Sequence, residues 1–148
     1  MEIQQKQNKL VLLIVCLGLI AFFLCACTST NSGNSEFEDK QKEMGEKIQK
    51  FVQILNDYKS KKIDEFALPA ELGTVQGETM ILVSEIEALV KMYPNNKQGQ
   101  KLLEGCKLYS EGIRIYSSGL ISKDSATMNT GSTKSIKGSK IIEKCEFE

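Results

Sequence analysis

The most regular pattern of apolar and polar positions follows Ser35. Apolar residues recur there mostly at alternating steps of four and three, which places them on one face of a helix; they are Phe37, Met44, Ile48, Phe51, Leu55 and Tyr58. Ser35 and Glu38 have the spacing of a capping box, so the helix is expected to begin at Ser35. Glu38–Lys42, Glu43–Lys47 and Glu46–Lys50 form i,i+4 pairs on what we interpret as a solvated outer face.

Two further helices are predicted. The second begins between Pro69 and Thr74, and Pro94 ends it. Its apolar face consists of Val75, Leu82, Ile86, Leu89 and Tyr93, and we interpret Met80, Ile81, Val83 and Val90 as widening this face. The third begins at Asn95 or Asn96 with a capping pattern. Its seam consists of Leu102, Cys106, Tyr109, Ile113, Tyr116 and Leu120. Because short connections make neighbouring helices antiparallel, the predicted fold is all-α, a small antiparallel three-helix bundle over residues 36–121.

Glycines recur every seven residues in the third helix, at Gly105, Gly112 and Gly119. Each costs about 1 kcal/mol relative to alanine in a helix interior. Their common stripe therefore indicates that something packs close to the backbone. We expect this neighbour to be the first or second helix. The alternatives are a partner protein or an apolar ligand in a groove, and surface glycines with no packing role.

The periodicity stops after residue 121. Small polar residues and lysines fill the sequence from Ser122 to Lys140, which predicts a mobile loop or a weak hairpin. Apolar character returns at the end, where Ile141, Cys145 and Phe147 would share one face of a short strand. Residues 122–148 are thus predicted to be a mobile polar tail that can end in a strand.

An unbroken apolar run occupies residues 10–24, preceded by Lys6 and Lys9. As a helix these 15 residues span about 22 Å, less than the roughly 30 Å of a bilayer core. The length favours a secretory signal over a permanent membrane span. An uncleaved N-terminal membrane helix from Leu10 to Ala26 is the alternative.

The end of this run, Leu24-Cys25-Ala26-Cys27, resembles the lipobox of bacterial lipoproteins. Cys25 competes for the role of modified cysteine, but Leu24 before it is too large for the position preceding the cut. The resemblance implies that signal peptidase II cleaves between Ala26 and Cys27. It also implies that lipid on Cys27 holds the mature protein to a membrane. Residues 1–26 would then be the signal peptide.

Residues 27–35 are expected to be the lipidated cysteine and a flexible tether, because residues 28–35 are all small or polar. Thr28, rather than aspartate, after the modified cysteine resembles the outer-membrane sorting class of Gram-negative lipoproteins. We therefore expect a cell-envelope location, which in a Gram-negative host is the periplasmic face of the outer membrane.

Two of the five cysteines would remain unmodified in the mature protein, Cys106 and Cys145. Disulfides persist outside the cytoplasm. A Cys106–Cys145 bridge would enclose 38 residues and stabilise the fold by roughly 3–4 kcal/mol in the chain-entropy model. We expect this disulfide; two separate buried thiols and a reactive or intermolecular cysteine are the alternatives.

The amino-acid composition argues against several kinds of binding and catalysis. The 19 basic and 19 acidic residues cancel, which argues against a nucleic-acid partner. The absence of histidine removes the usual general base and the commonest metal ligand. No familiar catalytic or metal-binding motif is present. We expect no enzyme activity, no cofactor and no metal.

Two functions remain. The first is a non-enzymatic accessory or scaffold protein that binds another envelope protein, which predicts an exposed apolar face, for example beside Gly105, Gly112 and Gly119. The second is an inhibitor or immunity-type lipoprotein that blocks an incoming toxin, lysozyme or phage protein. An inhibitor more often presents a charged or protruding loop, for which residues 122–140 are the candidate.

Overall fold

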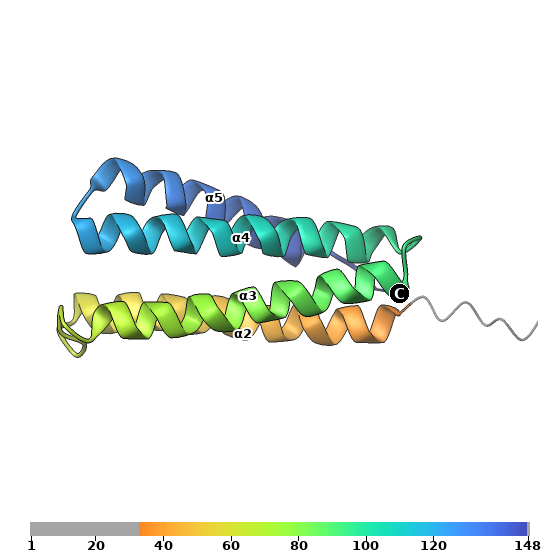
Figure 1. The fold of residues 1–148 in the computed structure, drawn as a ribbon, viewed down its shortest axis with the longest axis horizontal. Helices are drawn as coiled ribbons and strands as arrows, with labels where there is room; N and C mark the ends of the chain where they lie inside the picture. Colours follow the sequence, from red (N-terminus) through yellow and green to blue (C-terminus); the bar gives the residue numbers. More distant parts are fainter. Residues whose placement is uncertain (1–32, 148) are drawn as a thin grey trace, which may run out of the picture. The chain divides into compact units, whose positions relative to one another are not determined.

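The computed structural model describes residues 33–147, which contain four helices and no strand (Figure 1). The helices are α2 (Asn34–Lys59), α3 (Leu68–Met92), α4 (Lys97–Ser122) and α5 (Ser125–Glu143). The all-α prediction is confirmed. The prediction of three helices is wrong by one, because most of the predicted loop of residues 122–140 is part of α5.

Helix α2 begins at Asn34, one residue before the predicted start at Ser35. Gly33 adopts a left-handed conformation with φ of 66°, and its carbonyl accepts a hydrogen bond of 3.0 Å from the Phe37 N–H. The Tyr93 ring lies so close to Gly33 that a Cβ there would overlap it. Ser35 is therefore inside the first turn, and within residues 33–147 no side chain caps this end of the helix. The Ser35–Glu38 capping box is wrong.

The other predicted helix ends agree better with the structure. Helix α3 begins at Leu68, directly before Pro69, and ends two residues before Pro94. Asn96 is the N-cap of α4, and its side chain accepts a hydrogen bond of 2.8 Å from the Gly99 N–H. Proline restricts the backbone and the asparagine side chain accepts a hydrogen bond from a free amide. The residues at these helix ends therefore determine where the helices begin and stop.

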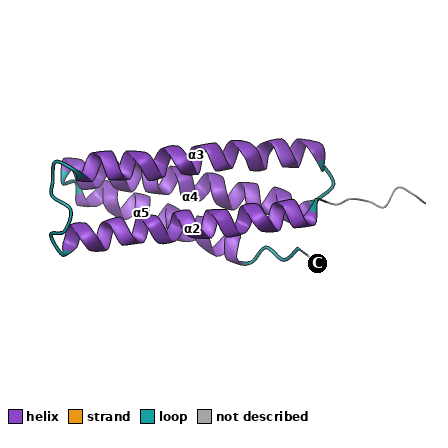
Figure 2. Ribbon diagram, turned by 90° about the horizontal axis from the view of Figure 1, so that it is seen from below, coloured by secondary structure: helices purple, strands orange, loops and turns teal. Residues whose placement is uncertain are grey.

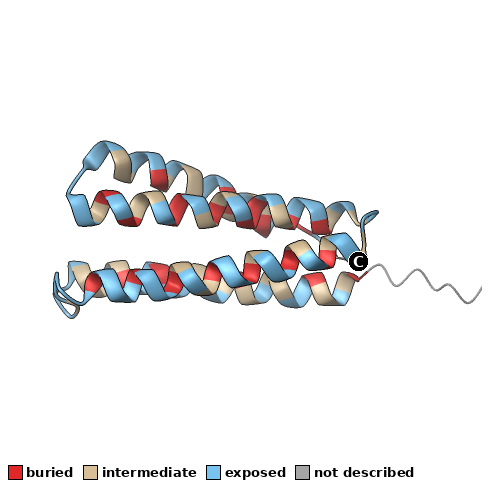
Figure 3. Ribbon diagram, in the orientation of Figure 1, coloured by how far each residue is buried: buried red, intermediate tan, exposed pale blue. Residues whose placement is uncertain are grey.

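The core lies where α2, α3 and α4 face one another, as the burial colouring shows (Figure 3). Its largest fully buried residues include Phe37 and Met44 from α2, Leu72 and Ile86 from α3, and Leu102 and Ile113 from α4. These residues belong to, or directly extend, the predicted apolar faces. The spacing of apolar residues thus defines the inward sides of three helices.

Of the three ion pairs expected within α2, one forms, and the lysines of the other two pair with α3 instead. Glu38–Lys42 forms as predicted, at 3.0 Å. Lys47 and Lys50, however, both reach Glu78 of α3, at 3.2 and 2.8 Å, instead of pairing within α2. The charged side of α2 is therefore partly an interface rather than only a solvated face. Exposed pairs of this kind contribute about 0.2–1 kcal/mol each.

Helix α5 lies along α4 on the side away from α3 (Figures 1 and 2). The Asp124 side chain caps it by accepting hydrogen bonds from the N–H groups of Ala126 and Thr127, at 3.0 and 3.4 Å. The buried residues of α5 are Gly131, Gly138 and Ile142. Because two of the three carry no side chain, the helix has almost no apolar periodicity by which to predict it. The predicted strand at residues 141–147 is also wrong.

Candidate functional site

The three glycines of the predicted stripe, Gly105, Gly112 and Gly119, all face α5. A Cβ added to Gly112 would overlap the backbone of Ser135. One added to Gly119 would lie 2.6 Å from the Met128 nitrogen. Something does pack against the backbone there, as expected, but it is α5 and not the first or second helix. The glycine stripe is filled from within the chain.

Helix α5 contributes its own glycines to the same contact. A Cβ on Gly131 or Gly138 would overlap the backbone of Tyr116 or Tyr109. The glycines alternate between the helices, each opposite a larger residue; the opposed pairs are Gly105–Ile142, Tyr109–Gly138, Gly112–Ser135, Tyr116–Gly131 and Gly119–Met128. The seven-residue interval between Gly131 and Gly138 was the sequence signal for this helix, and our sequence reasoning missed it.

The last residues of α5 and those after it are fastened to α2. The Gln41 side chain donates hydrogen bonds of 2.6 and 3.0 Å to the carbonyl oxygens of Ile142 and Cys145. The rings of Phe37 and Phe147 stack with their centroids 5.8 Å apart. The segment predicted to be mobile therefore has defined partners at its far end.

Next to this contact, a groove of about 250 Å³ separates α2 from α5. Its walls are Ile48, Phe51, Val52 and Leu55 of α2 and Ser132, Ser135, Ile136 and Ser139 of α5, and its base is formed by Tyr109 and Tyr116 of α4. Val52 and Ile136, one on each wall, are about half exposed. Sequence reasoning missed this groove because one of its walls was predicted to be a loop.

The groove offers apolar contact rather than reactive groups. Ser135 and Ser139 donate their hydroxyls to the carbonyl oxygens of Ser132 and Ile136 within α5. Burial raises the pKa of the Tyr109 hydroxyl, which keeps it neutral, and that hydroxyl has no hydrogen-bond partner among the described residues. The surface is therefore suited to binding apolar side chains.

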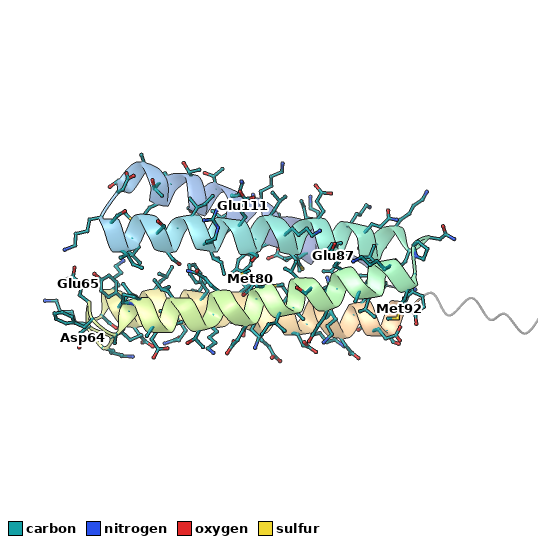
Figure 4. The ribbon with its side chains drawn as sticks, viewed as in Figure 1. Asp64, Glu65, Met80, Glu87, Met92 and Glu111 are labelled. Atoms are coloured by element: carbon teal, nitrogen blue, oxygen red, sulfur yellow. The ribbon has the colours of Figure 1, made fainter. Side chains whose placement is uncertain are left out.

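A second groove, of about 290 Å³, lies between α3 and α4. Met80 of α3 points toward it, and Glu111 of α4 lies on its far side (Figure 4). The Lys134 ammonium is 2.6 Å from Glu111 and holds the pKa of that carboxyl below its usual value. Lys107 pairs with Glu87 across the same two helices, at 3.5 Å. Charged pairs thus border an apolar strip of α3.

Cys106 and Cys145 are both buried, and both are free thiols. The predicted disulfide is not formed, and of the alternatives the structure has two buried thiols. Burial raises the pKa of both thiols, and the nearby Cys145 adds to the effect on Cys106. The Cys145 thiol donates to the Ile141 carbonyl oxygen, at 3.3 Å. Neutral, buried thiols are poor nucleophiles.

The acidic residues of the α2–α3 connection are already engaged. Asp64 accepts hydrogen bonds from the N–H groups of Phe66 and Ala67, at 2.9 and 2.8 Å. Glu65 pairs with Lys123 at 2.7 Å (both acids are labelled in Figure 4). Within residues 33–147, no group of three or more cysteine, aspartate or glutamate side chains could hold a metal ion.

The predicted cleavage and lipidation residues, Ala26 and Cys27, lie outside the described residues. In the part of the chain that the structure describes, no helix is both long and apolar enough to cross a bilayer.

Comparison with protein families, curated proteins and solved structures finds no match to this chain.

Proposed function

We propose that this chain is a cell-envelope lipoprotein, anchored by lipid on Cys27, that acts as a non-enzymatic accessory or scaffold protein by binding another envelope protein. The order of segments supports the anchor. An apolar run ends at the Leu24–Cys27 motif, and a short polar stretch then leads into α2 at Asn34.

One observation carries the binding role, which is the apolar groove between α2 and α5. Val52 and Ile136 expose apolar surface on its two walls, and Tyr109 and Tyr116 provide an aromatic base. Clustered apolar surface is typical of a protein contact site. We therefore assign the groove to the partner protein.

The chain length between the proposed anchor and the groove limits how far from the membrane a bound partner can be. The seven residues from Cys27 to Gly33 are joined by six Cα–Cα steps, so the distance between these two residues is at most about 20 Å. From Asn34 to Ile48, the first wall residue, is about 21 Å along α2. A partner within roughly 40 Å of the bilayer could therefore reach the groove.

The same geometry favours the scaffold over the inhibitor. The candidate inhibitory loop, residues 122–140, lies almost entirely in α5, and α5 packs against α4 through Gly131 and Gly138. A segment held along its length offers no protruding loop to insert into a target. The exposed apolar groove is the feature that a scaffold requires.

The anchor is tested by metabolic labelling with palmitate. Cys27→Ser should abolish labelling and leave the precursor uncut by signal peptidase II, because the lipid acceptor is gone. Cys25→Ser is the matched control and should be labelled normally. Normal labelling of Cys27→Ser would overturn the anchor assignment.

The binding role is tested by affinity capture of the tagged lipoprotein from cross-linked, detergent-solubilised membranes. A Val52→Lys/Ile136→Lys double variant should lose the captured partner, because it places charge on both walls of the groove. Ile121→Lys changes a similarly exposed apolar residue outside the groove and should retain it. Capture of no partner, or equal capture by all three forms, contradicts the proposal. Capture of a toxin, lysozyme or phage protein would instead support the inhibitor.

A further inference from the structure

The exposed residues of α3 differ in kind from those of α2. More than half of the exposed residues of α2 are charged; these are Glu38, Asp39, Lys42, Glu46, Lys50 and Lys59. Only three exposed residues of α3 are charged, namely Glu71, Glu85 and Lys91. A helix that faces water normally carries charged and polar residues on its outer side. The outer side of α3 is therefore not typical of a surface that faces water.

Three exposed residues lie in one line along α3. Ala70, Ile81 and Met92 are eleven residues apart, which is close to three helical turns, so successive members are rotated by only about 20°. Ile81 and Met92 are 63% and 62% exposed. The line from Ala70 to Met92 is about 33 Å long. Apolar residues thus follow almost the whole length of the helix on its outer side.

The exposed residues beside this line contain no carboxylate. They occupy an arc of about 120° on the helix, and the whole arc consists of Ala70, Gly73, Thr74, Gly77, Met80, Ile81, Ser84, Ala88, Lys91 and Met92. Met80 lies at the edge toward α4, where it lines the α3–α4 groove. Glu85 lies just beyond the other edge and pairs with Lys40 of α2, at 2.8 Å. The arc is therefore an apolar face whose one charge is positive.

This face begins where the chain enters the bundle. Tyr93 follows α3, and its ring packs against Gly33, the residue before α2. Met92 is therefore at the end of the bundle where α2 begins (Figure 4). The chain between Gly33 and the proposed anchor at Cys27 reaches at most about 20 Å. A bilayer that holds the anchor is therefore always within reach of the α3 face.

We propose that the outer face of α3 lies on the bilayer to which the N-terminus is attached, so that the bundle lies along the membrane instead of standing on it. Met80, Ile81 and Met92 would enter the boundary between headgroups and acyl chains. Small residues between them let the helix lie close, and the Lys91 ammonium would meet lipid phosphates. This contact rests on the membrane attachment in the proposed function, but lipid on Cys27 and an uncleaved N-terminal helix serve it equally.

The proposed orientation leaves the α2–α5 groove open. Helix α5 lies along α4 on the side away from α3 (Figure 1). With α3 against the bilayer, α5 would be the helix farthest from it, and both walls of the groove would lie outside the lipid contact. A partner protein and the membrane would therefore bind different faces of the bundle.

The first test uses the absence of tryptophan from the chain. The full chain, isolated from membranes with a single Ile81→Trp change, is reconstituted in phosphatidylcholine vesicles with or without bromine on the acyl chains, since bromine quenches tryptophan at short range. Ile81→Trp should lose fluorescence in the brominated vesicles. Ile136→Trp on α5, where the isoleucine is 51% exposed, is the matched control and should lose none. Equal fluorescence of Ile81→Trp in both kinds of vesicle overturns the proposal.

Two further tryptophans distinguish a bundle that lies on the membrane from one that stands on it. Ala70→Trp and Met92→Trp place the reporter at the two ends of the α3 line, about 33 Å apart. Both should be quenched by bromine if the bundle lies flat. Quenching of Met92→Trp alone would mean that only the tethered end touches the bilayer, and it would overturn the proposal.

A charge on the face tests whether Ile81 holds α3 to the bilayer. Ile81→Glu in the Ala70→Trp chain should abolish the quenching at residue 70, because a carboxylate is unfavourable against acyl chains. Ile136→Glu in the same chain is the control and should leave that quenching unchanged. Both isoleucines are on the surface, so both variants should keep their helical circular dichroism. Equal quenching in the two variants contradicts the proposal.

Failure of this contact and failure of the membrane attachment give different results. A wild-type chain that does not float with the vesicles refutes the attachment in the proposed function. A chain that floats, with Ile81→Trp unquenched by bromine, keeps the attachment and refutes only the α3 contact. If iodide in the water also fails to quench that tryptophan, a second copy covers the face, and the proposal is again overturned.

Discussion

Glycines occur on α4 and on α3 in helices of similar length, yet their surroundings are opposite. At Gly112 there is no room for a Cβ, because the Ser135 backbone occupies that space. At Gly77 a Cβ would meet nothing within 4 Å. The same residue type thus marks a closed contact between two backbones on one helix and an uncovered face on the other.

The comparison teaches that a glycine in a helix does not by itself reveal what is next to it. In the α4–α5 contact, the cost of each glycine is offset by van der Waals contact between helices that approach at backbone distance. On α3 the same cost has no compensation within the bundle. No contact among the described residues explains the glycines of α3.

The comparison is tested most severely by Gly112→Ala. Alanine favours the helix by about 1 kcal/mol, but its methyl group would overlap the Ser135 backbone, which cannot move without shifting α5. We expect a net destabilisation of about 2–3 kcal/mol and a melting temperature lower by roughly 10 °C. Thermal unfolding followed by circular dichroism measures it.

Ser118→Ala is the matched control for this change. Ser118 is exposed on the same helix, so its replacement should leave the melting temperature nearly unchanged. If Gly112→Ala raised the melting temperature, the close α4–α5 contact would be refuted.

Gln41→Ala tests whether α5 needs its attachment to α2 in addition to its glycine contact with α4. The change removes both hydrogen bonds to the Ile142 and Cys145 carbonyl oxygens near the end of α5. We expect a loss of about 1–2 kcal/mol. Hydrogen exchange should accelerate in the last turns of α5 more than in α3.

Gln49→Ala replaces an exposed glutamine of α2 and serves as the control, with no change in exchange expected. Uniform acceleration across all four helices in Gln41→Ala would show that α5 does not open separately from the bundle.

The fold could be predicted from the sequence only where burial is achieved by apolar side chains. Helices α2, α3 and α4 bury residues such as Met44, Ile86 and Ile113, and their apolar spacing predicts them. Helix α5 buries Gly131 and Gly138, which have no side chain and are typical of loops. Its prediction required knowing that α4 carries matching glycines.

The candidate site illustrates the same limit. The groove exists because α2 and α5 separate beyond the contacts that Gln41 makes, and no local pattern encodes that separation. The exposed residues of α3 were visible in the sequence, where Met80 and Ile81 were interpreted as widening the inward face. Apolar residues occur on both sides of α3, so only the packed structure distinguishes the buried side, with Leu82 and Ile86, from the exposed side, with Ile81.

The pH dependence of stability tests the burial of Cys106 beneath α5. Burial, with a contribution from Cys145, raises the pKa of this thiol above its usual value near 9. The folded state therefore keeps a proton that the unfolded state releases, so this stabilisation is complete below about pH 8.5 and is lost as pH rises. Between pH 7.5 and 9.5, the free energy of unfolding should fall by about 1 kcal/mol from this group.

Urea denaturation of wild type and Cys106→Ala at each pH measures the effect. The wild type should lose stability with pH more steeply than the variant, in which Cys145 and Tyr109 still contribute. Equal slopes would show that the Cys106 thiol ionises as readily in the folded protein as in the unfolded one, and that α5 does not shield it.

The smallest expected change in stability is a gain, in Gly77→Ala, whereas the largest is the loss in Gly112→Ala. In Gly77→Ala the new methyl group would meet no atom, so only the gain in helix propensity remains. We expect a stabilisation of about 0.5–1 kcal/mol, and the same for Gly73→Ala, measured by urea denaturation. Gly45→Ala on α2, where a Cβ also meets nothing within 4 Å, is the internal standard and should stabilise by a similar amount. A loss of stability in Gly73→Ala or Gly77→Ala, with a gain in Gly45→Ala, would mean that something packs closely against the α3 glycines, and the contrast with α4 would then fail.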